Sequence, residues 1–250
     1  MHNYSHIRRR GRVVTSGGSR ALLRMAEGSA VKLGENASLA VSDLADRASA
    51  GAARLVTASL DVVRGAFRFT TGVFGGSAAG RDVKIRISTV TAGIRGTDLW
   101  GKSDDRRDLV CLIEGAISVS HVQTGEFTMA HPLSFFVAPR NEKPLPVAAV
   151  DPKQLNEWAA ETEIQVGAGG ARRGGRHFVT ASVSVDQKSA LAAYHALRAA
   201  GYPAVVRPVK KDDGTLSYPV RVPNLATPQD AAATVAKLKT LGMPDAAAGR

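Results

Sequence analysis

The chain has 250 residues, 44% of them hydrophobic, and carries a formal net charge of +11 at pH 7. This length suffices for one large or two modest domains, and the basic charge predicts polyanionic surroundings such as nucleic acid, anionic headgroups or an acidic polymer. A single cysteine, Cys111, excludes an intrachain disulfide framework, and the lack of any apolar run of about 18 residues predicts no transmembrane helix.

Residues 1–19 predict a basic tail followed by a first strand. The segment MHNYSHIRRRGRVVTSGG contains an arginine cluster but lacks the apolar run, roughly 7 to 15 residues long, of a secretory signal. The cluster suits nonspecific electrostatic contact with an anionic polymer or with headgroups.

Residues 20–137 alternate between apolar and polar residues, and glycine-containing pairs interrupt the alternation at short intervals. Four stretches each hold such a pair between two strand-like runs, at residues 22–33, 60–69, 109–120 and 121–130. Such spacing is typical of repeated hairpins or of sharp corners in a stacked structure. We therefore predict an all-β domain of stacked hairpins or of a β-helix-like kind. Cys111 lies in its apolar run LVCLI, which predicts an inert, buried thiol.

The stretch AGIRGTDLWG, residues 92–101, predicts a structural corner in this domain. We expect a strand ending near Val90 and another starting near Thr97, with Gly93 and Gly96 adopting backbone angles closed to other residues. Arg95 and Asp98 would hydrogen-bond the turn itself.

Carboxylates that could serve acid–base chemistry gather just after this corner. Asp104, Asp105 and Asp108 alternate with two arginines in the segment KSDDRRD, which is typical of a solvated hairpin tip. We predict no catalytic role for them.

Residues 138–176 are rich in proline and glycine and predict a linker. Within it, residues 151–163 predict a short helix, with Asp151 as N-cap and Pro152 at the first helical position. Leu155 and Trp158 share one face of this helix, so we expect it to pack on the β domain.

Residues 177–250 predict the order β-α-β-β-α, followed by a segment of marginal length for a last strand. A shift of 41 residues superposes the first half on the second, including Gly201 on Gly242. One sheet face must be covered by the two helices, and its predicted residues are Val179, Ala181, Val220 and Val222. The opposite face would carry Phe178, Thr180, Ser182 and Arg221.

The stretches HFVTASVSV and YPVRVPNLATPQDAAATVAKLKTLG resemble the SPOR domain, the sporulation-related repeat of bacterial envelope proteins. The resemblance implies a ferredoxin-like β-α-β-β-α-β fold over residues 177–250, whose open sheet face binds peptidoglycan glycan strands stripped of stem peptides. The first strand lacks the glutamine common in that family. The residues expected to bind glycan are Phe178, Thr180, Ser182, Arg207 and Arg221, because hydroxyls, an arginine fork and one flat ring suit sugar groups.

The stretches VVTSGGSRALLRMAEGSAVKLGENASLAV, RGAFRF, VTAGIRGTDLW and VCLIEGAISVS resemble a FecR-like domain, over roughly residues 13–137. This resemblance implies a β-rich envelope module that signals or acts as a scaffold, without catalytic residues, and that binds another envelope protein. Both resemblances imply the periplasm or cell envelope. We therefore expect the start of the sequence to be truncated or misassigned.

No pattern of a catalytic or metal site is present. The six histidines form no ligand pair at helical spacing, and nucleophile-elbow, phosphate-loop and zinc-protease motifs are absent. We expect no enzyme activity, no metal and no cofactor.

Three functions remain open. The main prediction is a glycan-binding envelope protein. One alternative is a FecR-type signal-transduction or scaffold protein with incidental glycan binding. The other is RNA binding by the basic C-terminal sheet, although that sheet offers only Phe178 for base stacking. No DNA partner is expected.

Overall fold

The computed structural model describes residues 11–25, 28–47, 55–71, 80–94, 96–165, 167–172 and 174–250. Most of the predicted basic tail, as well as Arg95, lies outside them. Contacts divide the chain into two compact units with a boundary between Glu163 and Ile164. We call residues up to Glu163 the β unit and Ile164–Arg250 the C-terminal unit. Among the helices that the structure describes, none is long and apolar enough to cross a membrane.

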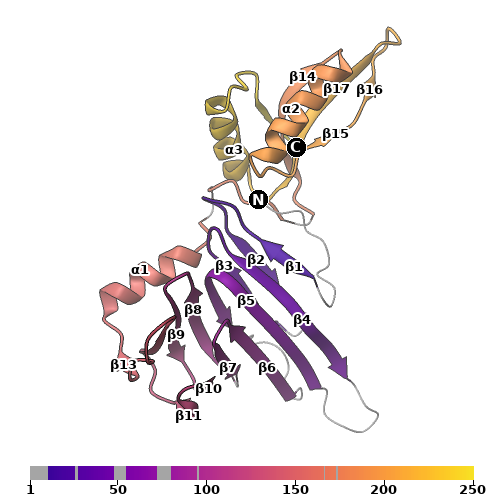
Figure 1. Ribbon diagram of the computed structural model, residues 1–250. Coiled ribbons are helices and arrows are strands. Elements are labelled where there is room, and N and C mark those ends of the chain that lie inside the picture. The colour runs from indigo at the N-terminus through magenta and orange to yellow at the C-terminus, as the bar shows by residue number, and fades with distance from the viewer. Residues whose placement is uncertain are drawn as a thin grey trace. The chain divides into compact units, whose positions relative to one another are not determined.

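Thirteen strands of the β unit form one hydrogen-bonded sheet (Figure 1). They are β1 (Arg12–Val14), β2 (Ala21–Arg24), β3 (Ala30–Leu33), β4 (Ser38–Arg47), β5 (Leu55–Thr70), β6 (Gly80–Ile87), β7 (Val90–Ile94), β8 (Asp98–Ser103), β9 (Arg107–Glu114), β10 (Ile117–His121), β11 (Gly125–Met129), β12 (Ser134–Pro139) and β13 (Ala148–Ala149).

The sheet branches at β5 and curls into two halves. The first part of β5 pairs with β4 and β6, which lead to β1 on one side and to β7, β10 and β11 on the other. The second part pairs with β3 and β8, which lead to β2 and to β9, β12 and β13. We call these the first and second halves of the sheet. One apolar core contains side chains from both, including Leu60 and Ile85 from the first half and Phe67 and Leu112 from the second.

The bend between the halves lies at Gly65. This residue has a φ of 89°, and a Cβ there would come within 2.5 Å of Ala37 Cα. Only glycine combines that backbone angle with such close approach. The residues around Gly65 thus form one continuous, bent strand.

The predicted glycine interruptions therefore divide into two kinds. Residues 22–33 and 121–130 form hairpins, whereas Gly65 and Gly115 mark passages from one half of the sheet to the other. The prediction of a β-helix-like form was wrong. A β-helix is built from parallel strands, and the pair β5–β6 is parallel while the other described pairs are antiparallel.

The predicted corner at residues 92–101 is only partly right. Gly96 has a φ of 69°, but Gly93 lies inside β7 without a positive φ. A Cβ at Gly93 would meet Ser118 Oγ at 2.5 Å, a contact that rotation of the serine side chain would relieve, so neither backbone angle nor packing demands glycine there. Asp98 accepts bonds from Arg68 at 2.9 and 2.6 Å rather than from the turn.

Helix α1 (Pro152–Thr162) covers the outer face of the second half, as its Leu155–Trp158 face predicted. Asp151 caps it by accepting bonds from Lys153 N and Gln154 N. The indole rings of Trp158 and Trp100 stack with centroids 5.1 Å apart and an interplanar angle of 2°.

The C-terminal unit follows the order β-α-β-β-α-β, with one short extra strand. Its elements are β14 (His177–Ser184), α2 (Gln187–Ala199), β15 (Val205–Val206), β16 (Val209–Lys210), β17 (Leu216–Leu225), α3 (Pro228–Thr240) and β18 (Ala247–Gly249). The strand order is β15-β17-β14-β18, and β16 also pairs with β17. The marginal last segment does form a strand, which pairs with residues 178–180. All described pairs in this sheet are antiparallel.

The internal repeat is visible in the structure. Helices α2 and α3 have 13 residues each, and both their starts and their ends are 41 residues apart. Gly201 and Gly242 end them with φ values of 85° and 83°. The four residues predicted to face the helices are buried in the core of this unit.

The glycine-rich part of the predicted linker is bound to the C-terminal unit. Asp230 Oδ1 accepts the N–H groups of Gly167, Gly169 and Gly170 at 3.0, 3.1 and 2.8 Å. Its Oδ2 accepts a bond from the N-cap Thr227. Because the end of this segment also bridges to Leu225, it is not a free linker from Gly167 onward.

Candidate functional site

The open face of the C-terminal sheet carries most of the residues that were predicted to bind a ligand. Directly opposed residues of antiparallel strands share a face. The register therefore places Val205, Arg221, Thr180 and Ala247 in one row across β15, β17, β14 and β18.

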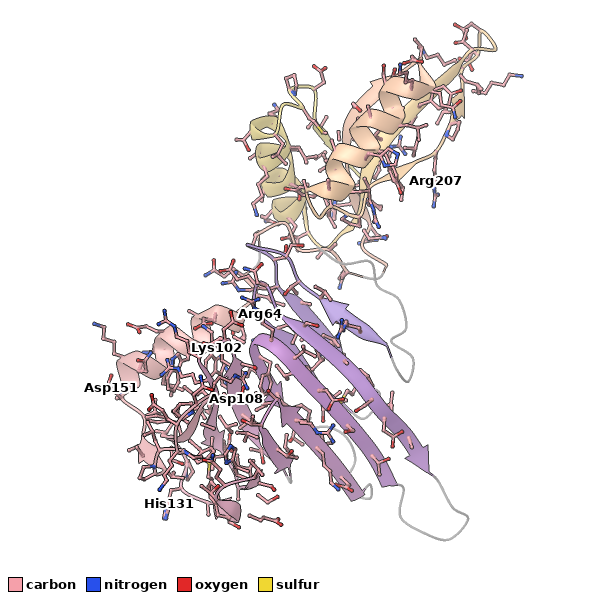
Figure 2. The ribbon with its side chains drawn as sticks, viewed as in Figure 1. Arg64, Lys102, Asp108, His131, Asp151 and Arg207 are labelled. Atoms are coloured by element: carbon pink, nitrogen blue, oxygen red, sulfur yellow. The ribbon has the colours of Figure 1, made fainter. Side chains whose placement is uncertain are left out.

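Arg207 lies on the same face. Val205 faces outward beside Arg221, while Val206 packs in the core. Alternation along an extended chain then returns Arg207 and Val209 to the outer side. Val209 pairs with Ser217 and is 46% exposed, and Arg207 is exposed on this unit (Figure 2). The register thus places Arg221 and Thr180 in one row, and alternation along the chain puts Arg207 on the same side.

Ser182 is the exception. A β-bulge lies between Thr180 and Ser182, so that Ser182 sits opposite Val220, whose side chain is fully buried on the helix side. The extra residue shifts the alternation, and Val183 takes the outward position opposite Pro219. The placement of Ser182 on the open face was therefore wrong, and Val183, which is 62% exposed, was missed.

Phe178 is not a bare platform. The guanidinium carbon of Arg221 lies 4.6 Å from the centroid of its ring. A Cβ at Gly249 would meet ring atoms of Phe178, so the ring lies directly against the backbone of β18. This cation–π contact holds Arg221 in place. The Nε atom of Arg221 is buried and has no hydrogen-bond partner among the described residues.

Asp108, in contrast to the prediction, is not part of a solvated hairpin tip. It is fully buried, and its two oxygens accept bonds from Arg140 at 2.9 Å each. Thr89 donates its N–H and its hydroxyl to the same carboxylate. Arg140 lies 32 positions away in the sequence, so spacing alone could not reveal the pair. Asp105 is exposed and Asp104 is half-buried.

A hollow of about 160 Å³ lies beside α1 in the β unit. Two of its charged groups form an ion pair, in which Lys102 Nζ lies 2.9 Å from Glu161 Oε2. Burial opposes ionisation of Asp104, but the N–H groups of Arg106 and Arg107 outweigh it and lower the pKa of Asp104. An acid that stays ionised in this way cannot serve as a proton donor near neutral pH.

Neither a reactive thiol nor a metal-ligand cluster is found among the described residues. Cys111 is buried, and desolvation raises the pKa of its thiol to about 12. No group of three or more histidine, cysteine, aspartate or glutamate residues could hold a metal ion among the residues described.

The first half of the β unit's sheet presents a polar outer face. The register aligns Ser118, Gly93, Lys84 and Ser59 in one row, and Ser120, Thr91, Arg86 and Asp61 in the next. Arg86 and Asp61 form an ion pair of 3.4 Å. We call these two rows the polar sheet face.

Residues 11–118 match the FecR protein family. This match includes the glycine-containing segments on which the FecR-like prediction rested, and it ends before the C-terminal unit. No curated protein matches the chain.

Two crystal structures of a candidate anti-sigma factor from Parabacteroides distasonis are similar to the chain, each at 12% identity and a TM-score of 0.44. The first similarity covers 59% of this chain and 64% of that one, and the second covers 82% and 96%. The chain thus spans less than two thirds of the first of these structures.

Proposed function

From the FecR match we propose that this protein is a noncatalytic signal-transduction or scaffold protein of the bacterial cell envelope, whose β unit binds another protein. The observation that carries the proposal is the match over residues 11–118, all within the β unit. The charge pairs of that unit support a noncatalytic role. Asp108 is neutralised by Arg140, and Lys102 by Glu161.

The two outer faces of the β unit differ in their availability. Helix α1 covers the outer face of the second half through the Trp100–Trp158 stack. The polar sheet face carries small side chains with Lys84 and Arg86 exposed. We therefore expect the partner, another envelope protein, to contact the polar sheet face.

Site-specific photo-crosslinking of the full chain in its native host tests this proposal. A photoreactive residue replaces Thr91 on the polar sheet face, and in a matched control it replaces Gln154 on α1. We expect one discrete crosslinked protein from position 91 and none from position 154. Absence of any product, or identical products from both positions, would contradict the proposal. A neighbouring gene for a sigma factor or transport receptor would identify the first partner to test.

Glycan binding by the C-terminal unit is the second candidate function, with residues 177–250 as a SPOR domain of ferredoxin-like fold. The strand order β15-β17-β14-β18 supports it, as does the presence of Arg207, Arg221 and Thr180 on one face. The covered ring of Phe178 and the shift of Ser182 weigh against it. The same covered ring weighs against RNA, which needs free aromatic faces.

Pull-down experiments with the full chain separate these ligands. Glycan strands without stem peptides, intact sacculi and RNA are offered in parallel. Retention on stripped glycan alone would support the glycan function. Failure on both glycan forms with retention on RNA would overturn it.

A further inference from the structure

We infer that the open face of the C-terminal sheet is a docking site for an acidic, apolar segment of a partner protein, bound through Arg221 and Arg207. The inference adds a second protein-binding surface to the proposed scaffold role, and it stands on the C-terminal unit alone.

The charge of this face has one sign. Arg221 lies near its centre, in the row formed by Val205, Thr180 and Ala247. Arg207 is the next outward residue after Val205. None of the outward residues in these rows is acidic, so the described part of the face offers no acidic partner to either guanidinium. A ligand that brings carboxylates would supply the missing partners.

The side chain of Arg221 is preorganised for contact with a carboxylate. Its guanidinium lies over Phe178 at 4.6 Å, which limits its rotamer freedom before binding. Its buried Nε has no acceptor among the described residues. A buried N–H without a partner is costly, and the planar fork of this arginine matches the two oxygens of a carboxylate.

The surroundings of the arginines are aliphatic. Val183, which pairs with the buried Pro219, is 62% exposed, and Val209, which pairs with Ser217, is 46% exposed. Protein interfaces combine arginine with buried apolar side chains at their centre. The combination fits an acidic segment that also carries apolar side chains.

Other occupants fit less well. Sugars and bases stack on free aromatic faces, whereas the only ring in these rows, that of Phe178, lies between Arg221 and Gly249. A second copy of this sheet would bring the arginines of both copies together without an acid to separate them.

Selection from a random-peptide library tests the inference on the full chain. Peptides that also bind the Arg207→Gln/Arg221→Gln double variant are removed. We expect enriched sequences that combine aspartate or glutamate with apolar residues. A synthetic copy of the most enriched peptide is then titrated by fluorescence anisotropy. Its affinity should fall about tenfold with Arg221→Gln, as expected for loss of a close charge pair, and likewise when its acids are replaced by amides.

Three controls keep the result interpretable. Arg198→Gln removes an exposed arginine of α2 that lies off this face, and it should leave affinity unchanged. Val183→Ser should weaken binding without touching the core, in case Arg221→Gln disturbs folding. Stripped glycan strands and vesicles of anionic phospholipid serve as competing probes.

The inference fails if no acidic peptides are enriched over the double variant, or if Arg198→Gln weakens binding as much as Arg221→Gln. It also fails if no peptide binds while stripped glycan or anionic vesicles do bind, and if Arg221→Gln abolishes that binding. Crosslinking at position 91 is independent of these outcomes, so failure here leaves the role proposed for the β unit standing.

Discussion

At the residue scale, Arg140, which follows β12, bonds to two separate turns of the β unit. Its guanidinium donates to Asp108, to the backbone oxygen of Asp104, and to the hydroxyls of Ser88 and Ser103. Ser88 lies in the β6–β7 connection and Asp104 in the β8–β9 connection, while Ser103 and Asp108 lie in the adjoining ends of β8 and β9. The two connections belong to different halves of the sheet. The ion pair therefore helps to hold the two halves together at this end.

Replacement of Arg140 by methionine should leave the buried carboxylate of Asp108 without a cation. We expect a loss of about 3–5 kcal/mol in the free energy of unfolding, which is typical when one partner of a buried pair is removed. Urea unfolding followed by tryptophan fluorescence measures it. The control Arg106→Met removes an exposed side chain and should change stability by less than about 0.5 kcal/mol. Equal effects of the two changes would contradict the assignment.

Asp230 organises the start of the C-terminal unit in a comparable way. Its burial opposes ionisation, but the bonds from Thr227, Gly170, Gly169 and Gly167 together outweigh this and lower the pKa of Asp230. Since the folded-state pKa lies below the unfolded one, the ionised group stabilises the fold at neutral pH. That contribution is lost as the pH falls through the lowered folded-state pKa.

Asp230→Asn should therefore destabilise the C-terminal unit at pH 7 by about 2 kcal/mol, the size of bonds to a charged acceptor. The difference from the unchanged protein should shrink once the pH falls below about 4, the ordinary range of an aspartate pKa. Unfolding followed by circular dichroism at several pH values tests this. A difference that stays constant into acid would show that the charge of Asp230 is unimportant.

At the element scale, the bend of β5 depends on the absence of a side chain at Gly65. Gly65→Ala combines a positive φ with a Cβ 2.5 Å from Ala37 Cα and Cβ. Gly96→Ala is the matched control, because Gly96 has a φ of 69° and nothing within 4 Å of its Cβ position. We expect the control to cost about 1 kcal/mol and Gly65→Ala to cost about 1–3 kcal/mol more through the clash. Chemical denaturation measures these losses in the free energy of unfolding. Similar losses for Gly65→Ala and Gly96→Ala would argue against close packing at the bend.

Trp158 anchors helix α1 through its stack on Trp100 and an edge contact with Phe135. Trp158→Ala should cost about 3–5 kcal/mol, as for other buried tryptophans, and should let water reach Trp100. The measurement is the free energy of unfolding together with the emission maximum of Trp100, which should shift to longer wavelength. Asn156→Ala, an exposed change on the same helix, is the control. An unshifted emission maximum in Trp158→Ala would contradict the assigned role of the helix as a cover.

At the scale of the whole molecule, each unit has its own core. The β unit buries two apolar clusters, one between the sheet halves and one beneath α1, while the C-terminal unit buries a third against α2 and α3. Such units are expected to unfold as separate cooperative bodies.

Both tryptophans, Trp100 and Trp158, belong to the β unit, so their fluorescence reports that unit alone. We expect Arg140→Met to shift the fluorescence transition and Asp230→Asn to leave its midpoint unchanged. Amide hydrogen exchange in α2 and α3 should instead be changed by Asp230→Asn and left unchanged by Arg140→Met. A common shift of both probes by either change would mean that the chain unfolds as one body.

The sequence by itself determined the features that depend on near neighbours. Caps at Asp151 and Thr227 define where α1 and α3 begin, because a capping side chain acts within one helical turn. The repeat placed α2 and α3 in equivalent positions. Period-two alternation identified the buried face of β14 and β17 up to the bulge.

Only the tertiary structure decided which distant residues meet. The pairing of Asp108 with Arg140, the bulge that moves Ser182 off the open face, and the cover of Phe178 by Arg221 all depend on strand order and register. Hydrogen bonding between strands is insensitive to side-chain identity, so local patterns restrict these pairings weakly. The open face of the C-terminal sheet thus combines arginines and aliphatic side chains with a ring, that of Phe178, which lies between Arg221 and Gly249.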